Sequence, residues 1–285
     1  MIDRLYAAEC YAKNVNVEFY INDIPISIRG PGFGSFWGAP INQYLVNKQN
    51  IVSMVIKPGD IPSRAKIGPV TGKYLASHNE GEEALIRICS YPKGALLGGP
   101  EALEIARISW PEKRTIKSKI DLDDYKLNSY PLTKEERFKI GKIFSATRSY
   151  AKAATIKKLT ESLTLSLSEF LQELYECIQQ ADDQKFIKLT SHRILDNTHS
   201  YGKDIKECMK QVESGFKLNL SLQDWALAPL DTENYDFRLC ANGKIIHCVS
   251  RDWKPIIREK PLEDKSQSFY DIFVSLIKRQ WQVVL

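Results

Sequence analysis

Three side chains that could bind a metal ion occur at helical spacing in one short segment. His192, Asp196 and His199 are separated by four and then three residues, so a continuous helix would place them on one face. Imidazole and carboxylate groups that converge in this way can share a zinc ion. However, Asn197 and Thr198 favour the end of a helix at this point. We therefore interpret the three residues as capping and surface groups, and we predict no metal and no cofactor.

Two serines stand three residues before a lysine, a spacing at which the amine can activate the hydroxyl as a nucleophile. The pairs are Ser63 with Lys66 and Ser149 with Lys152. The sequence contains neither the S-D-N and K-T-G motifs that complete such a site nor a G-x-S-x-G motif. We attribute both spacings to chance and predict no catalytic residue.

A further group of polar side chains lies near the end of the chain. Asn242-Gly243 predicts a tight turn between two alternating segments, which makes Arg238 and His247 cross-strand neighbours with Asp236 nearby. In a pocket, a histidine close to a carboxylate can move a proton. On an outer face the same residues are the polar side of an antiparallel sheet, which we favour. The candidate pocket residues are Tyr201, Asp236, Arg238, His247 and Asp271.

The segment IRGPGFGSFWGAP, residues 28–40, raises the question of a phosphate-binding loop. The dinucleotide motif G-x-G-x-x-G needs a third glycine where Ser35 stands and a helix after it. Pro31 also removes a backbone donor. We therefore interpret the segment as a turn.

Three aromatic residues in this turn, Phe33, Phe36 and Trp37, are candidate contacts for a partner protein. The alternative is that they fold under the turn and fill the core. Trp37 is also the one residue that suggests carbohydrate binding, which we favour less.

The first part of the chain has the period of two that is typical of strands. Val15 to Ile21 alternates, Asn22-Asp23 is a turn, and the alternation resumes at Ile24. We expect a further turn at 47–50 and further strands at 51–56, 84–89 and 102–110. This pattern predicts an N-terminal, mainly-β sandwich over residues 1–111, followed by a linker over 112–132.

From residue 133 the pattern changes. Thr133-Lys134-Glu135-Glu136 is a capping box that predicts a long helix at the start of a second domain, residues 133–285. We expect further helices from the capping box at Ser166, over 186–194 and over 205–216, then strands around Asn242-Gly243 and at 255–258, 269–277 and 281–285. The second domain is therefore α+β, with helices followed by an antiparallel meander.

This order of elements resembles a known family. The helix, break and helix of FLQELYECIQQADDQKFIKLTSHR (170–193) and the closing strands LCANGKIIHCV (239–249) and LIKRQWQVVL (276–285) resemble the nuclear-transport-factor-2-like (SnoaL-like) α+β cone. An acid, a base or a tyrosine usually serves the open cone of that family. No such residue can be assigned here from the family's pattern, so the resemblance implies the fold and does not assign an activity. The N-terminal half resembles no family that we recognise.

Composition narrows the class of protein. The 285 residues are 43% hydrophobic and 26% charged, as in an average globular protein, and the net charge of +5 comes from 40 basic and 35 acidic side chains. This excess is too small to predict a nucleic-acid partner. The six cysteines form no C-x-x-C pair, and we see neither a secretory signal nor a membrane span. We expect a cytoplasmic protein without a membrane partner.

These observations predict a non-enzymatic cytoplasmic protein that recognises another protein. An immunity-type inhibitor of a bacterial toxin is one concrete form. The alternative is a small-molecule-binding protein or an acid–base enzyme that uses a pocket in the C-terminal cone.

Overall fold

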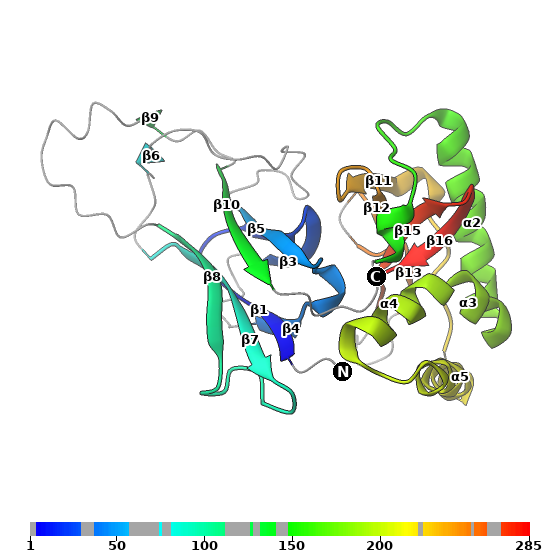
Figure 1. Cartoon of the computed structure of the whole chain (residues 1–285). Helices are drawn as coiled ribbons and strands as arrows, with labels where there is room; N and C mark the ends of the chain where they lie inside the picture. The colour runs from blue at the N-terminus through cyan, green and yellow to red at the C-terminus, as the bar shows by residue number, and fades with distance from the viewer. Residues whose placement is uncertain are drawn as a thin grey trace, which may run out of the picture. The chain divides into compact units, whose positions relative to one another are not determined.

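Figure 1 shows a computed structural model of the chain, which divides into two compact units, Met1–Ile143 and Phe144–Leu285. The structure describes residues 4–29, 37–56, 74–75, 81–111, 126–127, 132–140, 148–221, 225–251, 254–260 and 269–285. Most of the predicted linker and the glycine-rich turn at 30–36 lie outside these residues.

The first unit contains two four-stranded antiparallel sheets, as expected from the period of two. In one sheet the strand order is β4 (Trp37–Pro40), β1 (Arg4–Lys13), β7 (Glu83–Pro92) and β8 (Leu103–Trp110). In the other it is β10 (Leu132–Ile140), β5 (Lys48–Ile56), β2 (Val17–Ile21) and β3 (Ile24–Arg29). Strand β8 contacts both β10 and β5 of the other sheet.

Local turn chemistry explains the β2–β3 hairpin. Asn22 and Asp23 have φ angles of 52° and 66°, the left-handed conformation that a tight hairpin turn needs and that Asn and Asp tolerate. This predicted turn is confirmed. The turn expected at 47–50 is wrong in part, because β5 already begins at Lys48. The remaining elements are η1 (Asn42–Tyr44) and a short parallel pair, β6 (Tyr74–Leu75) and β9 (Lys126–Leu127).

The helix predicted from the capping box at Thr133 is wrong, because this segment forms strand β10. It pairs with β5 from Leu132 opposite Ile56 to Ile140 opposite Lys48. Phe138 and Ile140 are buried two residues apart and Lys139 between them is exposed, which is the pattern of a strand. Tertiary pairing has overridden the local helix signal. Residues 133–140 therefore belong to the first unit, which ends at Ile143 rather than at 111.

The second unit has a mixed α+β architecture, as predicted. Its helices are α2 (Glu161–Gln179), α3 (Asp183–Leu189), α4 (Ser191–Tyr201) and α5 (Ile205–Ser221). Asp182 caps α3, because its carboxylate accepts from the Lys185 amide at 2.9 Å. Helix α2 begins earlier than expected, at Glu161, because Thr160 rather than Ser166 accepts from a first-turn amide.

Four antiparallel strands follow the helices in sequential order and form one sheet. They are β11 (Tyr235–Cys240), β12 (Ile245–Ser250), β15 (Ile272–Ile277) and β16 (Gln280–Val284). Outside this sheet, two-residue strands β13 (Ile257–Arg258) and β14 (Phe269–Tyr270) pair with each other. The unit also contains the short helices η2 (Ser149–Lys152) and η3 (Thr232–Asn234). The predicted register, with Arg238 opposite His247, is confirmed. The core lies between α2 and the face of the sheet that carries Ile246, Cys248 and Val274.

Candidate partner-binding loop

The predicted aromatic contacts occupy different places in the structure. Phe33 and Phe36 lie outside the described residues. Trp37 is the first residue of β4, opposite Cys10 of β1, and its side chain is half-buried. Trp37 is therefore part of the first sheet rather than the tip of an open turn.

Among the described residues of the first unit, the large exposed apolar side chains gather elsewhere, in the connection between β7 and β8 and at the first residue of β8. We call residues 93–103 the leucine loop. Leu96 is 81% exposed, Leu97 38% and Leu103 60%. Single exposed leucines are ordinary, but three within eight residues of one connection form an apolar protrusion of the kind that marks contact sites.

The base of the leucine loop is apolar and packed. Ala7, Cys89 and Tyr91 form a buried cluster on one face of the first sheet, and Ala95 and Ala102 of the loop pack against it. Within the loop, the amides of Ala95, Gly99 and Ala102 donate to the carbonyls of Pro92, Leu96 and Gly99 at 3.0–3.2 Å. Small residues thus pack the ends of the loop against the sheet, while the leucines stay exposed.

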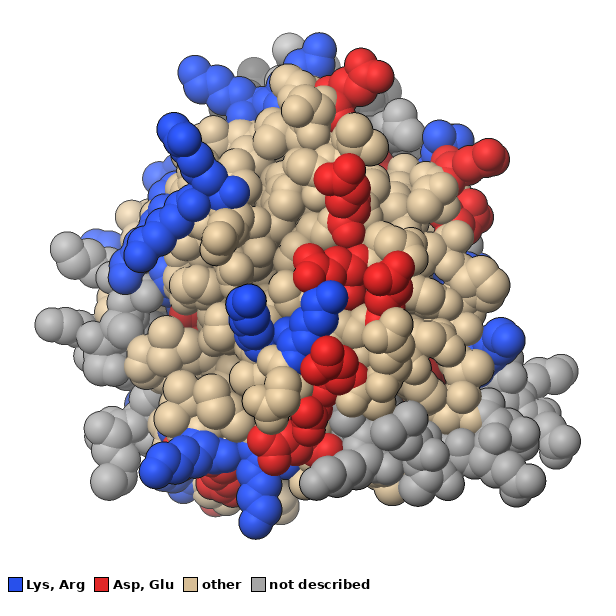
Figure 2. Space-filling view, turned by 90° about the vertical axis from the view of Figure 1, so that its right-hand side faces the viewer, with Lys and Arg blue, Asp and Glu red and all other residues tan. Residues whose placement is uncertain are grey.

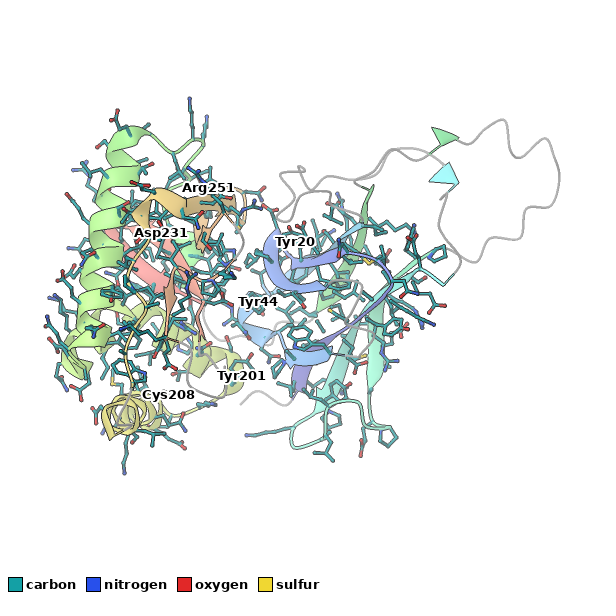
Figure 3. All side chains as sticks on the ribbon, turned by 180° about the vertical axis from the view of Figure 1, so that it is seen from behind. Tyr20, Tyr44, Tyr201, Cys208, Asp231 and Arg251 are labelled. Atoms are coloured by element: carbon teal, nitrogen blue, oxygen red, sulfur yellow. The ribbon has the colours of Figure 1, made fainter. Side chains whose placement is uncertain are left out.

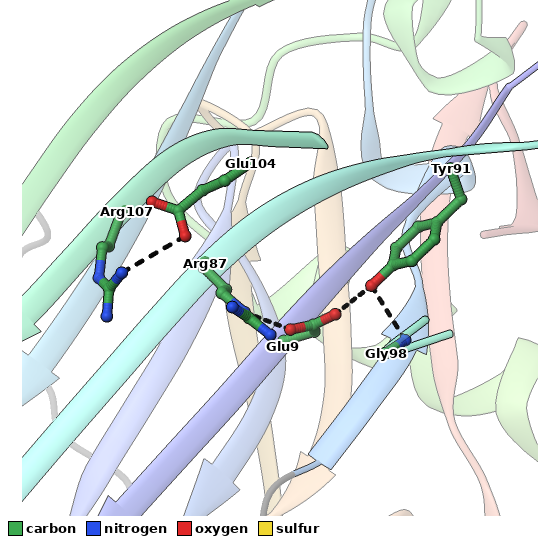
Figure 4. Close-up of polar contacts among 6 residues, drawn as sticks. All are labelled: Glu9, Arg87, Tyr91, Gly98, Glu104 and Arg107. Carbon is green, nitrogen blue, oxygen red and sulfur yellow. Dashed lines mark hydrogen bonds and ion pairs between the residues drawn. The ribbon is translucent and has the colours of Figure 1, made fainter. Parts of the chain in front are cut away.

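A chain of polar contacts lies beneath the loop (Figure 4). The carboxylate of Glu9, on β1, is buried and accepts hydrogen bonds from the Arg87 guanidinium and the Tyr91 hydroxyl. The Tyr91 oxygen in turn accepts from the Gly98 amide at 3.0 Å. A buried carboxylate is stable only when it is paired and hydrogen-bonded, and this arrangement provides both.

The electrostatics of this chain of contacts keep Arg87 charged and Tyr91 neutral. Burial opposes the Arg87 cation, but the hydrogen bond and charge of Glu9 outweigh it, so the pKa of Arg87 is raised. Burial, followed by the hydrogen bond to Glu9, raises the pKa of Tyr91 to about 12. The Tyr91 hydroxyl therefore remains a donor to Glu9 at neutral pH.

The raised pKa of Tyr91 predicts a specific loss of stability in alkali. The folded chain holds the phenol proton more tightly than the unfolded chain, whose tyrosine has a pKa of 10.0. The resulting stability is complete below pH 10 and is lost as the pH rises through 12. We expect the difference in free energy of unfolding between the wild type and Tyr91→Phe to shrink over this range, measured by urea unfolding. A difference that stays constant with pH would contradict this.

The candidate pocket residues come together in part, on the second-unit sheet. Arg238 pairs opposite His247, and the His247 Nε2 atom lies 3.9 Å from the Asp271 carboxylate. The Arg238 side chain donates to Asp236 at 3.1 Å, and the ring of Phe273 stacks on His247 with centroids 4.3 Å apart. By alternation, this face is opposite the one that forms the core against α2.

This placement changes how the pocket candidates are interpreted. Apolar side chains fill the space between α2 and the sheet. Asp236, Arg238 and His247 lie on the opposite face of the sheet. His247 is buried rather than solvent-facing, so the favoured interpretation of its face as open polar surface is wrong.

Tyr201, the fifth candidate, lies elsewhere, at the end of α4 (Figure 3). Burial lowers the pKa of the nearby Arg148 guanidinium, and Tyr150, Asp196 and Tyr201 act against this shift. Arg148 and Asp196 are both buried, and burial raises the pKa of the Asp196 carboxyl. Each Asp196 carboxylate oxygen accepts from the Ser149 amide at 3.0 Å, so this cluster joins η2 to α4.

The same cluster accounts for two of the sequence motifs. The Ser149 hydroxyl donates to Asp196 at 3.0 Å rather than meeting Lys152, whereas Ser63 and Lys66 lie outside the described residues. Helix α4 runs through Asn197 to Tyr201, so the helix end expected at Asn197 is wrong, and Gly202 with φ of 61° ends the helix instead. In the described part of the chain, no three His, Cys, Asp or Glu side chains group so as to hold a metal ion.

The surface of the second unit carries charges of both signs. Figure 2 shows acidic side chains in a column down the middle of one face, with basic side chains beside them. Helix α2 contributes Glu169, Glu173 and Glu176 at helical spacing, and Lys185 pairs with Glu173 at 3.1 Å. Among the helices within the described residues, none has the length and low polarity needed to cross a membrane.

Comparison of the chain with protein-family models, with curated proteins and with solved structures found no match. The resemblance of the second unit to the nuclear-transport-factor-2-like cone therefore stays a prediction.

The leucine loop was missed by the sequence reasoning, although a signal for it exists. The segment KGALLGGPEAL, residues 93–103, reads as a turn because of its glycines and proline. Turns usually expose small polar residues, so two adjacent leucines between glycines are the anomaly that points to a surface contact.

Proposed function

We propose that the protein is a non-enzymatic, cytoplasmic protein that recognises another protein, and that the leucine loop provides the central contact. The observation that carries the proposal is the exposure of Leu96, Leu97 and Leu103 on a connection whose base is held by packing and hydrogen bonds. Apolar side chains presented on a fixed backbone lose little conformational freedom on binding. All six cysteines are thiols, which supports a reducing compartment.

The charges around the loop favour a protein over a lipid surface. Lys93 and Arg107 are exposed beside Glu101 and Glu104, and Arg107 pairs with Glu104 at 3.5 Å. A membrane-binding loop of this size needs a basic excess to reach anionic headgroups, whereas this neighbourhood is balanced. A balanced polar rim around an apolar centre is the usual composition of a protein interface.

Capture of partners by matched variants tests the proposal. The tagged full chain, a Leu96→Asp/Leu97→Asp variant and a Leu165→Asp control serve as baits in cytosol of the source cells. Leu165 is 62% exposed on α2 and therefore matches the loop leucines in exposure. We expect the wild type and the control to retain one protein stoichiometrically, with the loop variant weakened about tenfold or more.

The affinity of the captured protein is then measured by titration against each bait. Equal affinity for all three baits would contradict the role of the loop. Binding of the loop to anionic vesicles in place of a protein would contradict protein recognition.

The concrete form of the proposal is an immunity-type inhibitor of a bacterial toxin. In that case the captured protein stops growth when it is produced alone, and co-production of the wild-type chain restores growth. Co-production of the Leu96→Asp/Leu97→Asp variant does not. A partner that is harmless alone would contradict the toxin assignment and leave protein recognition in place.

For the architecture, we propose a β-sandwich for the first unit and a nuclear-transport-factor-2-like cone for the second. Contacts of β8 with β10 and β5 support the first, because they join the two sheets. Four helices followed by a sequential antiparallel sheet, with α2 on one face, support the second.

A further inference from the structure

The hydroxyl of Tyr91 links the leucine loop to the sheet below it. The other hydrogen bonds of the loop backbone described above join residues within the connection itself, from Pro92 to Ala102. The bond from the Gly98 amide to Tyr91 instead reaches a side chain that is buried against Ala7 and Cys89. Gly98 also has φ of +79°, a conformation that glycine adopts without strain.

The direction of each hydrogen bond between Arg87, Glu9, Tyr91 and Gly98 follows from the chemistry of the Glu9 carboxylate. An ionised carboxylate can only accept hydrogen bonds, so the Tyr91 hydroxyl donates its proton to the hydrogen bond with Glu9. The Arg87 guanidinium donates to the same carboxylate. The Tyr91 oxygen then presents its lone pairs to the Gly98 amide, which donates at 3.0 Å. The buried charge of Glu9 thus determines the orientation of the group that holds the loop.

We infer, on the basis of the proposed function, that Tyr91 is the positioning residue of the partner site: its hydroxyl couples buried Glu9 to the Gly98 backbone and holds Leu96 and Leu97 in place for the partner. The Leu96 carbonyl accepts from the Gly99 amide, so the position of Gly98 sets that of Leu96. Holding the loop in its bound form lowers the entropic cost of association.

Tyr91→Phe tests this inference, because it removes the hydroxyl and keeps the buried ring. The matched control is Tyr11→Phe, which removes a hydroxyl from the same strand as Glu9, two residues away and on the same face. Hydrogen exchange of the Gly98 amide is followed in the full chain. We expect exchange at Gly98 to become about fivefold faster in Tyr91→Phe, the usual value of one hydrogen bond, and to be unchanged in Tyr11→Phe.

Which amides exchange faster in Tyr91→Phe distinguishes a role of Tyr91 in positioning the loop from a role in the stability of the whole sheet. The positioning role requires a larger increase in exchange rate at Gly98 than at the amides of β1 and β7, which report the overall loss of stability. An increase throughout both strands as large as the one at Gly98 would overturn it, because Tyr91 would then support the sheet as a whole. Unchanged exchange at Gly98 would overturn it equally.

The affinity of Tyr91→Phe for the partner protein is the second test of this inference. We expect the affinity of Tyr91→Phe to lie between those of the wild type and the Leu96→Asp/Leu97→Asp variant. Affinity equal to the wild type, with a loop variant that does lose the partner, would overturn the positioning role. If exchange at Gly98 rises but even the leucine substitutions leave capture intact, the proposed function fails and the hydrogen-bond assignment stands.

Discussion

Replacing Gly243 with alanine is expected to lower the free energy of unfolding of the second unit by about 3 kcal/mol. Gly243 lies in the β11–β12 turn with φ of +76°, and a Cβ there would stand 2.2 Å from the Ile156 carbonyl oxygen. The Ile156 backbone cannot move away from the turn easily, because the Ile156 amide donates to the Gly243 carbonyl at 2.8 Å. The measurement is urea unfolding of the full chain.

Gly94→Ala is the matched control for this prediction. Gly94 also has a left-handed backbone, with φ of +89°, but a Cβ there would meet nothing within 4 Å. It isolates the backbone cost of replacing glycine, about 1 kcal/mol. If both substitutions lower the free energy of unfolding by the same amount, the close approach of Ile156 to the turn does not contribute to the cost of Gly243→Ala.

Asp196→Ala is expected to cost about 2–4 kcal/mol, because the buried amide and hydroxyl of Ser149 both lose their acceptor. The Asp196 carboxylate accepts from the amide and the hydroxyl of Ser149 at 3.0 Å, and Arg148 donates to the Asp196 carbonyl at 3.3 Å. Burial raises the pKa of Asp196 and lowers that of Arg148, and the charge of each group acts against the shift in the other.

Asp182→Ala provides the comparison, because Asp182 is an exposed aspartate that caps α3. Loss of such a cap costs about 1 kcal/mol. Asp196→Asn, which keeps the shape and an acceptor for Ser149, is expected to fall between the two. A cost for Asp196→Ala as small as that for Asp182→Ala, by urea unfolding, would show that the buried cluster adds little beyond one cap.

Much of the secondary structure was predictable because its signals are local. Asn22-Asp23 and Asn242-Gly243 can adopt left-handed backbones, so both hairpins, and the register of the second, follow from a few neighbouring residues. The apolar period of 205–216 marked helix α5 in the same way.

The errors occurred where distant pairing decided the outcome. Residues 133–136 fit a capping box, yet the free edge of β5 gave this segment a pairing partner, and burial of Phe138 and Ile140 favoured the strand. The candidate site shows the same limit. Glu9 and Arg87 are 78 residues apart in sequence, and no local pattern indicates that they meet.

Residue types at short spacing were enough to predict the two hairpins, most helices and the absence of recognised catalytic motifs. Three features became visible only in the folded chain: the Arg238–His247 face lies opposite the core, Asp196 binds Ser149 rather than joining His192 and His199, and Leu96 is exposed. Burial and charge pairing depend on contacts between strands and helices far apart in the chain, and residue spacing does not encode these contacts.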